Sequence, residues 1–134
     1  MANFYSQGRT NYFTVTDGKS FETAVHNMNE GASSPIELHG GGDNTYCLLF
    51  PEGVPAWVYN EDTGEDYQFE MEDFIRGYLA DGSVCIIMET GAENMRYLSG
   101  WSVAFNNKGE RKAVSLDDIY EGLGSLGDFT RCEY

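Results

Sequence analysis

Apolar residues in the first third of the chain follow a helical interval. Phe21, Val25 and Met28 are spaced as on one face of a helix. Asp17 is a residue type that caps the start of helices, and Gly31 is one that ends them. The pattern therefore predicts a short amphipathic helix between Asp17 and Gly31.

Two further helices are predicted later in the chain. Residues 71–79 carry apolar side chains at a 3.6-residue period, and Gly82 follows as a stop signal. The apolar residues are Met71, Phe74, Ile75, Tyr78 and Leu79. Ser115 and Asp118 are spaced as in a capping box, which predicts a third helix that continues to about residue 123.

Runs of β-branched, aromatic or alternating apolar residues predict strands around these helices. Residues 83–88, SVCIIM, are mainly apolar and form the best candidate for a central strand. At residues 96–106 large residues alternate with small ones, which is typical of a strand that packs on both sides. The other predicted strands are residues 11–16, 36–39, 46–50, 54–59, 66–70, 110–114 and 128–134. Residues 1–10 are polar and are expected to be loosely held.

Three short stretches have the composition of turns. Residues 60–65, NEDTGE, favour a hairpin loop in which Gly64 is free to adopt a positive φ. Residues 40–43, GGGD, are expected to form a flexible hairpin turn. A phosphate site is disfavoured there, because neither a Lys nor a helix start follows the glycines. Residues 91–94, GAEN, are expected to lead the chain into the strand at residues 96–106.

The whole chain, residues 1–134, is expected to form one α+β domain with a largely antiparallel sheet and about three short helices. No linker or change in composition divides it. Hydrophobic residues make up 41% of the chain and aromatic residues 14%. These fractions exclude a disordered acidic chain, because such chains are poor in aromatic residues.

The cysteines suggest a reducing environment. Cys47, Cys85 and Cys132 are odd in number and far apart, and none belongs to a Cys-x-x-Cys pair. We interpret them as buried free thiols. The N-terminal residues lack the apolar core of a secretory signal, and no stretch has the length and hydropathy of a membrane span. A cytoplasmic location is therefore expected.

Charge is the most unusual property of the sequence. Acidic residues number 22 against 8 Lys and Arg, so the formal net charge is −14, and no Lys or Arg occurs between Lys19 and Arg76. Within this interval residues 61–73 carry seven carboxylates, threaded with apolar residues that indicate folded surface. The seven are Glu61, Asp62, Glu65, Asp66, Glu70, Glu72 and Asp73. Glu72 and Asp73 also suit the positive end of a helix dipole.

No combination of residues points to a catalytic or cofactor site. A hydrolytic nucleophile needs an oriented base, and His26 and His39 lie in weakly defined settings. A carboxylate pair could serve a glycosidase, but with so many acids a chance pair is uninformative. The glycine of residues 60–64 comes one position too early for an EF-hand, so only weak divalent-metal binding is expected. We therefore expect no catalytic residue, no cofactor and no dedicated metal site.

Direct contact with nucleic acid is disfavoured by the sign of the charge. The basic residues are scattered, and only Lys108, Arg111 and Lys112 cluster. A strongly negative surface repels nucleic acid and acidic membranes, and it attracts basic proteins.

Four segments of the chain carry a family resemblance. They are residues 9–17 (RTNYFTVTD), 88–110 (METGAENMRYLSGWSVAFNNKGE), 114–121 (VSLDDIYE) and 130–134 (TRCEY). Together they resemble a family of small acidic proteins encoded on phages, plasmids and other mobile elements; residues 31–64 are the least similar part. The resemblance implies a context, because small acidic proteins of mobile elements often inhibit host defence, as antirestriction and anti-CRISPR proteins do.

These observations favour an inhibitor that mimics nucleic acid. Carboxylates on one side of a strand repeat at about 6.6 Å, near the spacing of phosphates. We expect the seven carboxylates of residues 61–73 to bind the basic nucleic-acid-binding surface of a host nuclease or CRISPR effector complex, in the cytoplasm of the host cell and without catalysis.

Two alternatives remain open. The chain could be a non-catalytic assembly or scaffold module whose acidity serves solubility. It could also be a carboxylate-based enzyme, which would require a pocket that contains a carboxylate or His of perturbed pKa. One continuous acidic face would favour mimicry, and carboxylates scattered over several sides would favour solubility.

Overall fold

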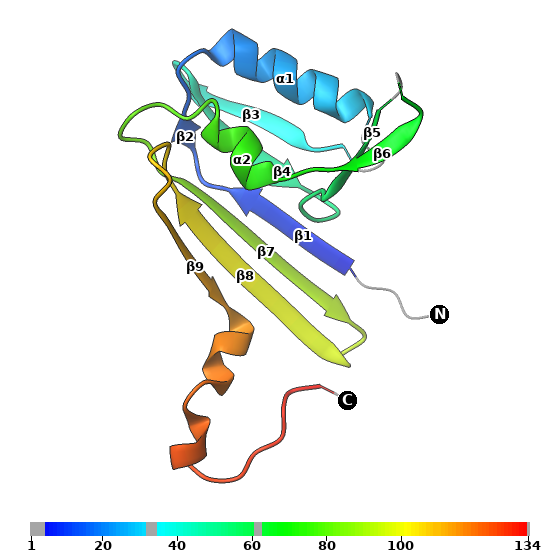
Figure 1. The fold of residues 1–134 in the computed structure, drawn as a ribbon, viewed down its shortest axis with the longest axis vertical. Coiled ribbons are helices and arrows are strands. Elements are labelled where there is room, and N and C mark those ends of the chain that lie inside the picture. Colours follow the sequence, from blue (N-terminus) through cyan, green and yellow to red (C-terminus); the bar gives the residue numbers. More distant parts are fainter. Residues whose placement is uncertain (1–4, 32–34, 61–62, 134) are drawn as a thin grey trace.

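A computed structural model describes residues 5–31, 35–60 and 63–133, with the backbone alone for residues 57–60 and 66–67. In this part of the chain a seven-stranded antiparallel sheet has the order β2-β4-β1-β7-β8-β9, and β3 also pairs with β4 (Figure 1). Its strands are β1 (Tyr5–Thr10), β2 (Phe13–Thr14), β3 (Glu37–Gly42), β4 (Thr45–Phe50), β7 (Cys85–Glu93), β8 (Tyr97–Phe105) and β9 (Arg111–Ser115). A separate hairpin is formed by β5 (Trp57–Asn60) and β6 (Glu65–Gln68).

The helices are short. They are α1 (Gly18–Glu30), α2 (Met71–Arg76) and two 3-10 helices, η1 (Leu116–Tyr120) and η2 (Leu123–Ser125). Together with the antiparallel sheet they confirm the predicted α+β fold class. None of the helices in the described residues is both long and apolar enough to cross a membrane. The C-terminal segment after β9 extends away from α1 and α2 (Figure 1, orange to red).

The predicted central strand is confirmed. β7 contains most of the SVCIIM run and lies between β1 and β8 in the sheet. It pairs with β1 from Tyr5↔Ala92 to Thr10↔Ile87, and with all of β8. Cys85 and Ile87 are fully buried, which explains why this run is apolar.

Helix α1 begins and ends where the sequence predicts. The Ser20 backbone N–H donates to Asp17 Oδ1 at 3.2 Å, which satisfies one of the free N–H groups of the first turn. Gly31 is the C-terminal cap, and its N–H donates to the Met28 carbonyl at 3.2 Å. Phe21, Val25 and Met28 are buried on one face, as their spacing predicts.

An aromatic cluster around Phe21 joins the helices to the sheet. The Phe21 ring centroid lies 5.7 Å from that of Phe13 in β2, 5.5 Å from that of Tyr46 in β4 and 5.4 Å from that of Tyr78. Phe74 in α2 lies 6.1 Å away. Each contact adds directional aromatic packing to the burial of apolar area, and the cluster holds α1 against β2, β4 and the α2 region.

Helix α2 is shorter than the predicted residues 71–79. Its last residue is Arg76, and Gly77 caps it. Beyond this point the Tyr78 carbonyl accepts from Thr16 N at 3.0 Å, and Val15 forms a β-bridge with Leu79. Leu79 remains buried, as its spacing predicts, but it reaches the core from extended backbone because pairing with residues 14–16 replaces the last helical turn.

The expectation that residues 1–10 are loosely held is wrong for Tyr5–Thr10. These residues form β1, an interior strand that pairs with β7 along its length and with β4 at Gly8 and Arg9. Backbone hydrogen bonds, which do not depend on side-chain polarity, order this segment. Its buried side contains Gly8 and Thr10; a Cβ atom at Gly8 would lie 2.8 Å from the Met88 carbonyl oxygen.

Several predicted boundaries move for similar reasons. The turn expected at residues 91–94 lies later, because β7 continues to Glu93 and the positive φ values fall at Asn94 and Met95. The hairpin expected at residues 40–43 exists, but the glycines belong to β3 and the positive φ of a non-glycine residue falls at Asn44.

The predictions for the C-terminal segment are only partly correct. The predicted helix at residues 115–123 is a 3-10 helix, η1, followed by η2; its Ser115–Asp118 capping box is present. The strand expected at residues 128–134 is wrong, since only an isolated bridge joins Glu133 to Tyr97 in the described residues. Cys132 is exposed, which corrects the expectation that all three cysteines are buried; Cys47 and Cys85 are buried and all three thiols are free.

Replacement Phe21→Ala should lower the free energy of unfolding by about 3–5 kcal/mol, because it empties the centre of the aromatic cluster. Urea denaturation followed by circular dichroism measures the loss. Thr23→Ala on the exposed side of the same helix is the control and should change stability by about 0.5 kcal/mol or less. Similar stability losses for the two variants would contradict the assigned role of Phe21.

Cys85 should resist thiol reagents in the folded protein. Burial, reinforced by the negative charge of Glu72, raises the pKa of the Cys85 thiol well above its ordinary value, so the reactive thiolate is scarce. Mass spectrometry after brief alkylation should find Cys132 labelled first. In a Cys132→Ser variant, native labelling should nearly disappear and return in denaturant. Rapid labelling of Cys85 in the native state would refute its burial.

Candidate functional site

The acidic stretch runs through the β5–β6 hairpin into α2. Glu61 and Asp62 lie outside the described residues. Asp66 lies in β6, and its side chain is likewise outside them. Glu65, at the start of β6, is exposed and pairs with Asn60 across the hairpin. The predicted hairpin is therefore confirmed at the level of the backbone.

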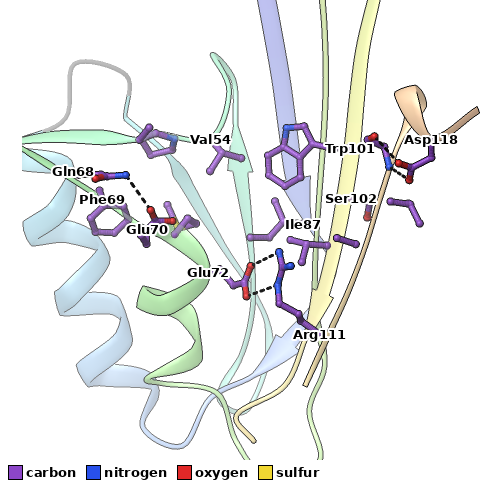
Figure 2. Close-up of a pocket in the computed structure, with 17 residues that line it drawn as sticks. Val54, Gln68, Phe69, Glu70, Glu72, Ile87, Trp101, Ser102, Arg111 and Asp118 are labelled. Atoms are coloured by element: carbon purple, nitrogen blue, oxygen red, sulfur yellow. Dashed lines mark hydrogen bonds and ion pairs between the residues drawn. The ribbon is translucent and has the colours of Figure 1, made fainter. Parts of the chain in front are cut away.

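Glu70 is the exposed carboxylate at the junction of the hairpin and α2. It occupies the cap position of α2, although its side chain makes no capping hydrogen bond. Its Oε1 accepts from Gln68 Nε2 at 3.2 Å (Figure 2). In the described part of the chain neither Glu65 nor Glu70 forms an ion pair, so both present uncompensated negative charge.

Glu72 and Asp73 do not fit the picture of seven uncompensated carboxylates. Arg111 of β9 donates from Nε to Glu72 Oε2 and from Nη2 to Glu72 Oε1, both at 3.1 Å (Figure 2). Arg76 donates from Nη2 to Glu72 Oε2 at 2.5 Å and from Nη1 to Asp73 Oδ1 at 2.8 Å. The expectation of a solvent-facing charge is therefore wrong for Glu72, whose side chain is only 21% exposed.

The two arginines keep Glu72 ionised. Partial burial alone would raise the pKa of Glu72, but the hydrogen bonds from Arg111 and Arg76 outweigh it and hold that pKa below its usual range. Arg76 also stacks over the Phe105 ring, with its Cζ 5.1 Å from the centroid, and donates to the Asn106 carbonyl. The Glu72 pair therefore ties α2 to the β8 and β9 side of the sheet.

A cavity of about 500 Å³ lies between the acidic segment and the β8–β9 side of the sheet (Figure 2). Its walls are mainly apolar, and a few polar side chains also line it. The acidic segment contributes Gln68, Phe69, Glu70, Met71 and Glu72. The sheet and its loops contribute the apolar residues Val54, Ile87, Trp101 and Val103, together with Arg111 and Asp118.

Glu89 holds two walls of this cavity together. Its Oε2 accepts from the Trp101 indole Nε1 at 2.7 Å, and its Oε1 accepts from the Val54 backbone N–H at 2.7 Å. The first bond orients the indole, and the second fixes the loop before β5 against β7. Both carboxylate oxygens are thus used structurally, which assigns Glu89 to positioning the cavity walls.

Two of the carboxylates around the cavity already have partners within the chain. Glu72 is held ionised by two cations, and Asp118 accepts from Ser115 N at 2.8 Å and from Ser115 Oγ at 3.2 Å as part of a helix cap. His26 and His39 are exposed, lie beside Glu30 and Glu37 respectively, and do not line the cavity. What the site offers is an apolar hollow with Glu70 exposed at its edge.

Exposed carboxylates also occur on other elements. Glu30 on α1 and Asp117, Glu121 and Asp128 of the C-terminal segment are exposed. In the described part of the chain the exposed carboxylates are therefore spread over several elements. Among the described residues, no three His, Cys, Asp or Glu side chains gather in a way that could hold a metal ion. Comparisons with protein-family models, curated proteins and solved structures found no match to the chain.

The sequence hypothesis missed the sheet side of the site. Trp101, Glu89 and Arg111 are distant in sequence from residues 61–73, and only strand pairing brings them together. Alternation in residues 96–106 placed Trp101 on the bulky side of its strand, which was a usable signal. Nothing local indicated that Arg111 would neutralise Glu72, because the sequence does not specify which strand packs beside α2.

Replacement Glu72→Gln should lower the free energy of unfolding at pH 7 by about 1–3 kcal/mol, because it removes charge-assisted hydrogen bonds from Arg111 and Arg76. The pKa of Glu72 is lower in the folded state than its ordinary value. Its stabilisation is therefore complete above the unfolded pKa and is lost as pH falls through the folded pKa. Urea denaturation of both proteins across the acid range measures the difference.

The stability gap between wild type and Glu72→Gln should shrink as pH falls through this window. Glu121→Gln removes an exposed carboxylate for which no ion pair is described, and it should show little difference at any pH. A gap between wild type and Glu72→Gln that stays constant from neutral to acid pH would show that the ion pairs contribute no stability.

Proposed function

We propose that the protein binds a basic, nucleic-acid-binding surface of another protein and blocks it by charge mimicry, without catalysis. The observation that carries the proposal is a pair of exposed carboxylates without a described cation to neutralise them: Glu70 at the edge of the cavity and Glu65 at the start of β6 in the adjoining hairpin. The net charge of −14 adds a long-range field that attracts basic proteins. Glu61, Asp62 and Asp66 remain part of the proposed surface by their sequence position.

The proposed binding surface differs from the one that the sequence suggests. Glu72 and Asp73 already have arginine partners within the chain, so they contribute less to attraction than Glu65 and Glu70. The cavity adds an apolar surface beside the exposed charges. A long Lys or Arg side chain of the partner can pack its aliphatic stem against Trp101 or Phe69 while its charge meets Glu70.

The energetics call for several weak contacts acting together. An exposed ion pair contributes about 0–1 kcal/mol, so no single substitution should abolish binding. A preorganised set of such pairs gives fast association and a steep dependence on salt. The resemblance to acidic proteins of mobile elements suggests a host target, a defence nuclease or a CRISPR effector complex.

The competing function is a scaffold or assembly module whose acidity serves solubility alone. The wide distribution of exposed carboxylates favours this alternative. The two functions differ in one measurable respect: mimicry depends on where the charge lies, and solubility depends only on how much charge there is.

Charge reversal at the proposed surface should abolish capture of a basic partner. The protein is immobilised, host lysate is passed over it at low and high salt with and without duplex DNA or RNA, and bound proteins are identified by mass spectrometry. We expect nucleic-acid-binding proteins that are released by salt and by competing nucleic acid. Glu65→Lys/Glu70→Lys should lose them, because two attractive contacts become repulsive.

The matched control is Glu121→Lys/Asp128→Lys, which changes the net charge by the same amount at exposed positions on the C-terminal segment. This control should retain the captured proteins. Equal retention by both variants, or capture that ignores added nucleic acid, would exclude mimicry at this surface and leave solubility as the explanation of the charge.

A further inference from the structure

The sheet has one face that α1 and α2 leave uncovered. Helices α1 and α2 contribute to a core with strand residues such as Leu48 and Ile87. Strand residues that alternate with these point to the opposite side. Met88 is 57% exposed there, and Leu98 and Val114 are each 53% exposed.

Strand pairing aligns this opposite side into a continuous surface. One row crosses six strands in register: Glu37, Leu49, Arg9, Met88, Ser102 and Val114. We use "outer face" for this row together with the residues two and four positions from each within the same strand. Leu116 extends the face beyond β9, because its side chain lies against Gly100, where an added Cβ would be 3.1 Å from Leu116 Cδ1.

The outer face is depleted of carboxylates although the chain is strongly acidic. The chain has 134 residues, of which 22 are Asp or Glu. Among the described strand positions of the outer face, Glu37 is the single acidic residue. Arg9 and Lys112 lie on the same face, so its formal charge is not negative. Solubility alone would place acidic side chains on an exposed sheet face, and their absence indicates that this face is covered by something.

We infer that the outer face is the interface between two copies of this chain, packed sheet on sheet about a two-fold axis. Two bodies of charge −14 repel each other, and the outer face is the side on which they can approach with least repulsion. A strongly basic partner would instead be held by the acidic sides and would not require a face without carboxylates. A two-fold dimer needs one self-complementary surface, which is what the chain offers.

The size of the face is sufficient for such a dimer. Six strands at about 4.8 Å spacing and about 20 Å of strand length cover roughly 500–600 Å² per copy. Two copies would bury about 1,000–1,200 Å², at the lower end of specific interfaces, so the dimer should be reversible. A shallow hollow of about 410 Å³ next to Arg9, Leu49 and Met88 gives room for side chains that project from the other copy.

The dependence on salt separates this interface from the acidic site. Screening weakens repulsion between two negative bodies, so dimerisation through the outer face should strengthen as salt is added. Binding of a basic partner by the acidic site should weaken under the same conditions. The two proposals therefore succeed or fail independently.

Analytical ultracentrifugation of the purified protein tests the inference at several protein concentrations and at low and high salt. We expect a mass that rises with concentration from the 15.0 kDa of one chain toward twice that value, and further with salt. Met88→Glu and, separately, Leu98→Glu should keep the protein monomeric, since each places a charge in the interface. Both side chains are exposed, so the fold should persist, as circular dichroism can verify.

Leu126→Glu adds the same charge at an 84% exposed position on the C-terminal segment and should dimerise like wild type. The inference would be overturned if the wild-type protein stays monomeric under all conditions. It would equally be overturned if this face binds only an unrelated protein. A dimer that Met88→Glu and Leu98→Glu leave intact, or a dimer that dissociates as salt increases, would also overturn it.

Discussion

A sheet has two faces, and the two α-helices of this chain cover only one of them. Helices α1 and α2 pack on the side that contains Leu48 and Ile87, and the aromatic cluster around Phe21 holds them there. This one-sided cover determines the rest of the molecule. It places the core between helices and sheet, leaves the β5–β6 hairpin to form the edge of a cavity, and leaves Met88, Leu98 and Val114 exposed on the opposite face.

The carboxylates are distributed differently on the two faces of the sheet. On the covered side, the carboxylates that approach the sheet have assigned structural partners: Glu72 is bound by Arg111 and Arg76, and Glu89 accepts from Trp101. Exposed carboxylates in the described residues include Glu65 of the hairpin, Glu22 and Glu30 of α1, and several in the C-terminal segment. The outer face carries almost none. We propose that the acidic sides bind a basic partner and that the face of low charge binds a second copy; salt would affect these two associations in opposite directions.

The candidate site shows how far a local pattern reaches. The turn residues at 60–65 and the apolar period from residue 71 were sufficient to locate a hairpin and a helix start, and both are present. It could not distinguish Glu70, which remains exposed, from Glu72, two positions later, which is neutralised by an arginine 39 residues away. Glu70 has extended backbone at the cap position and Glu72 lies in the first turn of α2, and only the packing of β9 beside α2 determines which one meets a cation.

The sequence by itself determined the α+β class, the limits of α1, the central position of β7 and the burial of Cys85, because each follows from the spacing of apolar residues within one segment. Tertiary structure alone decided the ordering of Tyr5–Thr10, the early end of α2 and the cavity between Trp101 and the acidic segment. These depend on backbone pairing between distant strands. Every non-proline residue carries the same backbone donor and acceptor, so composition leaves the choice of partner unspecified until the chain has folded.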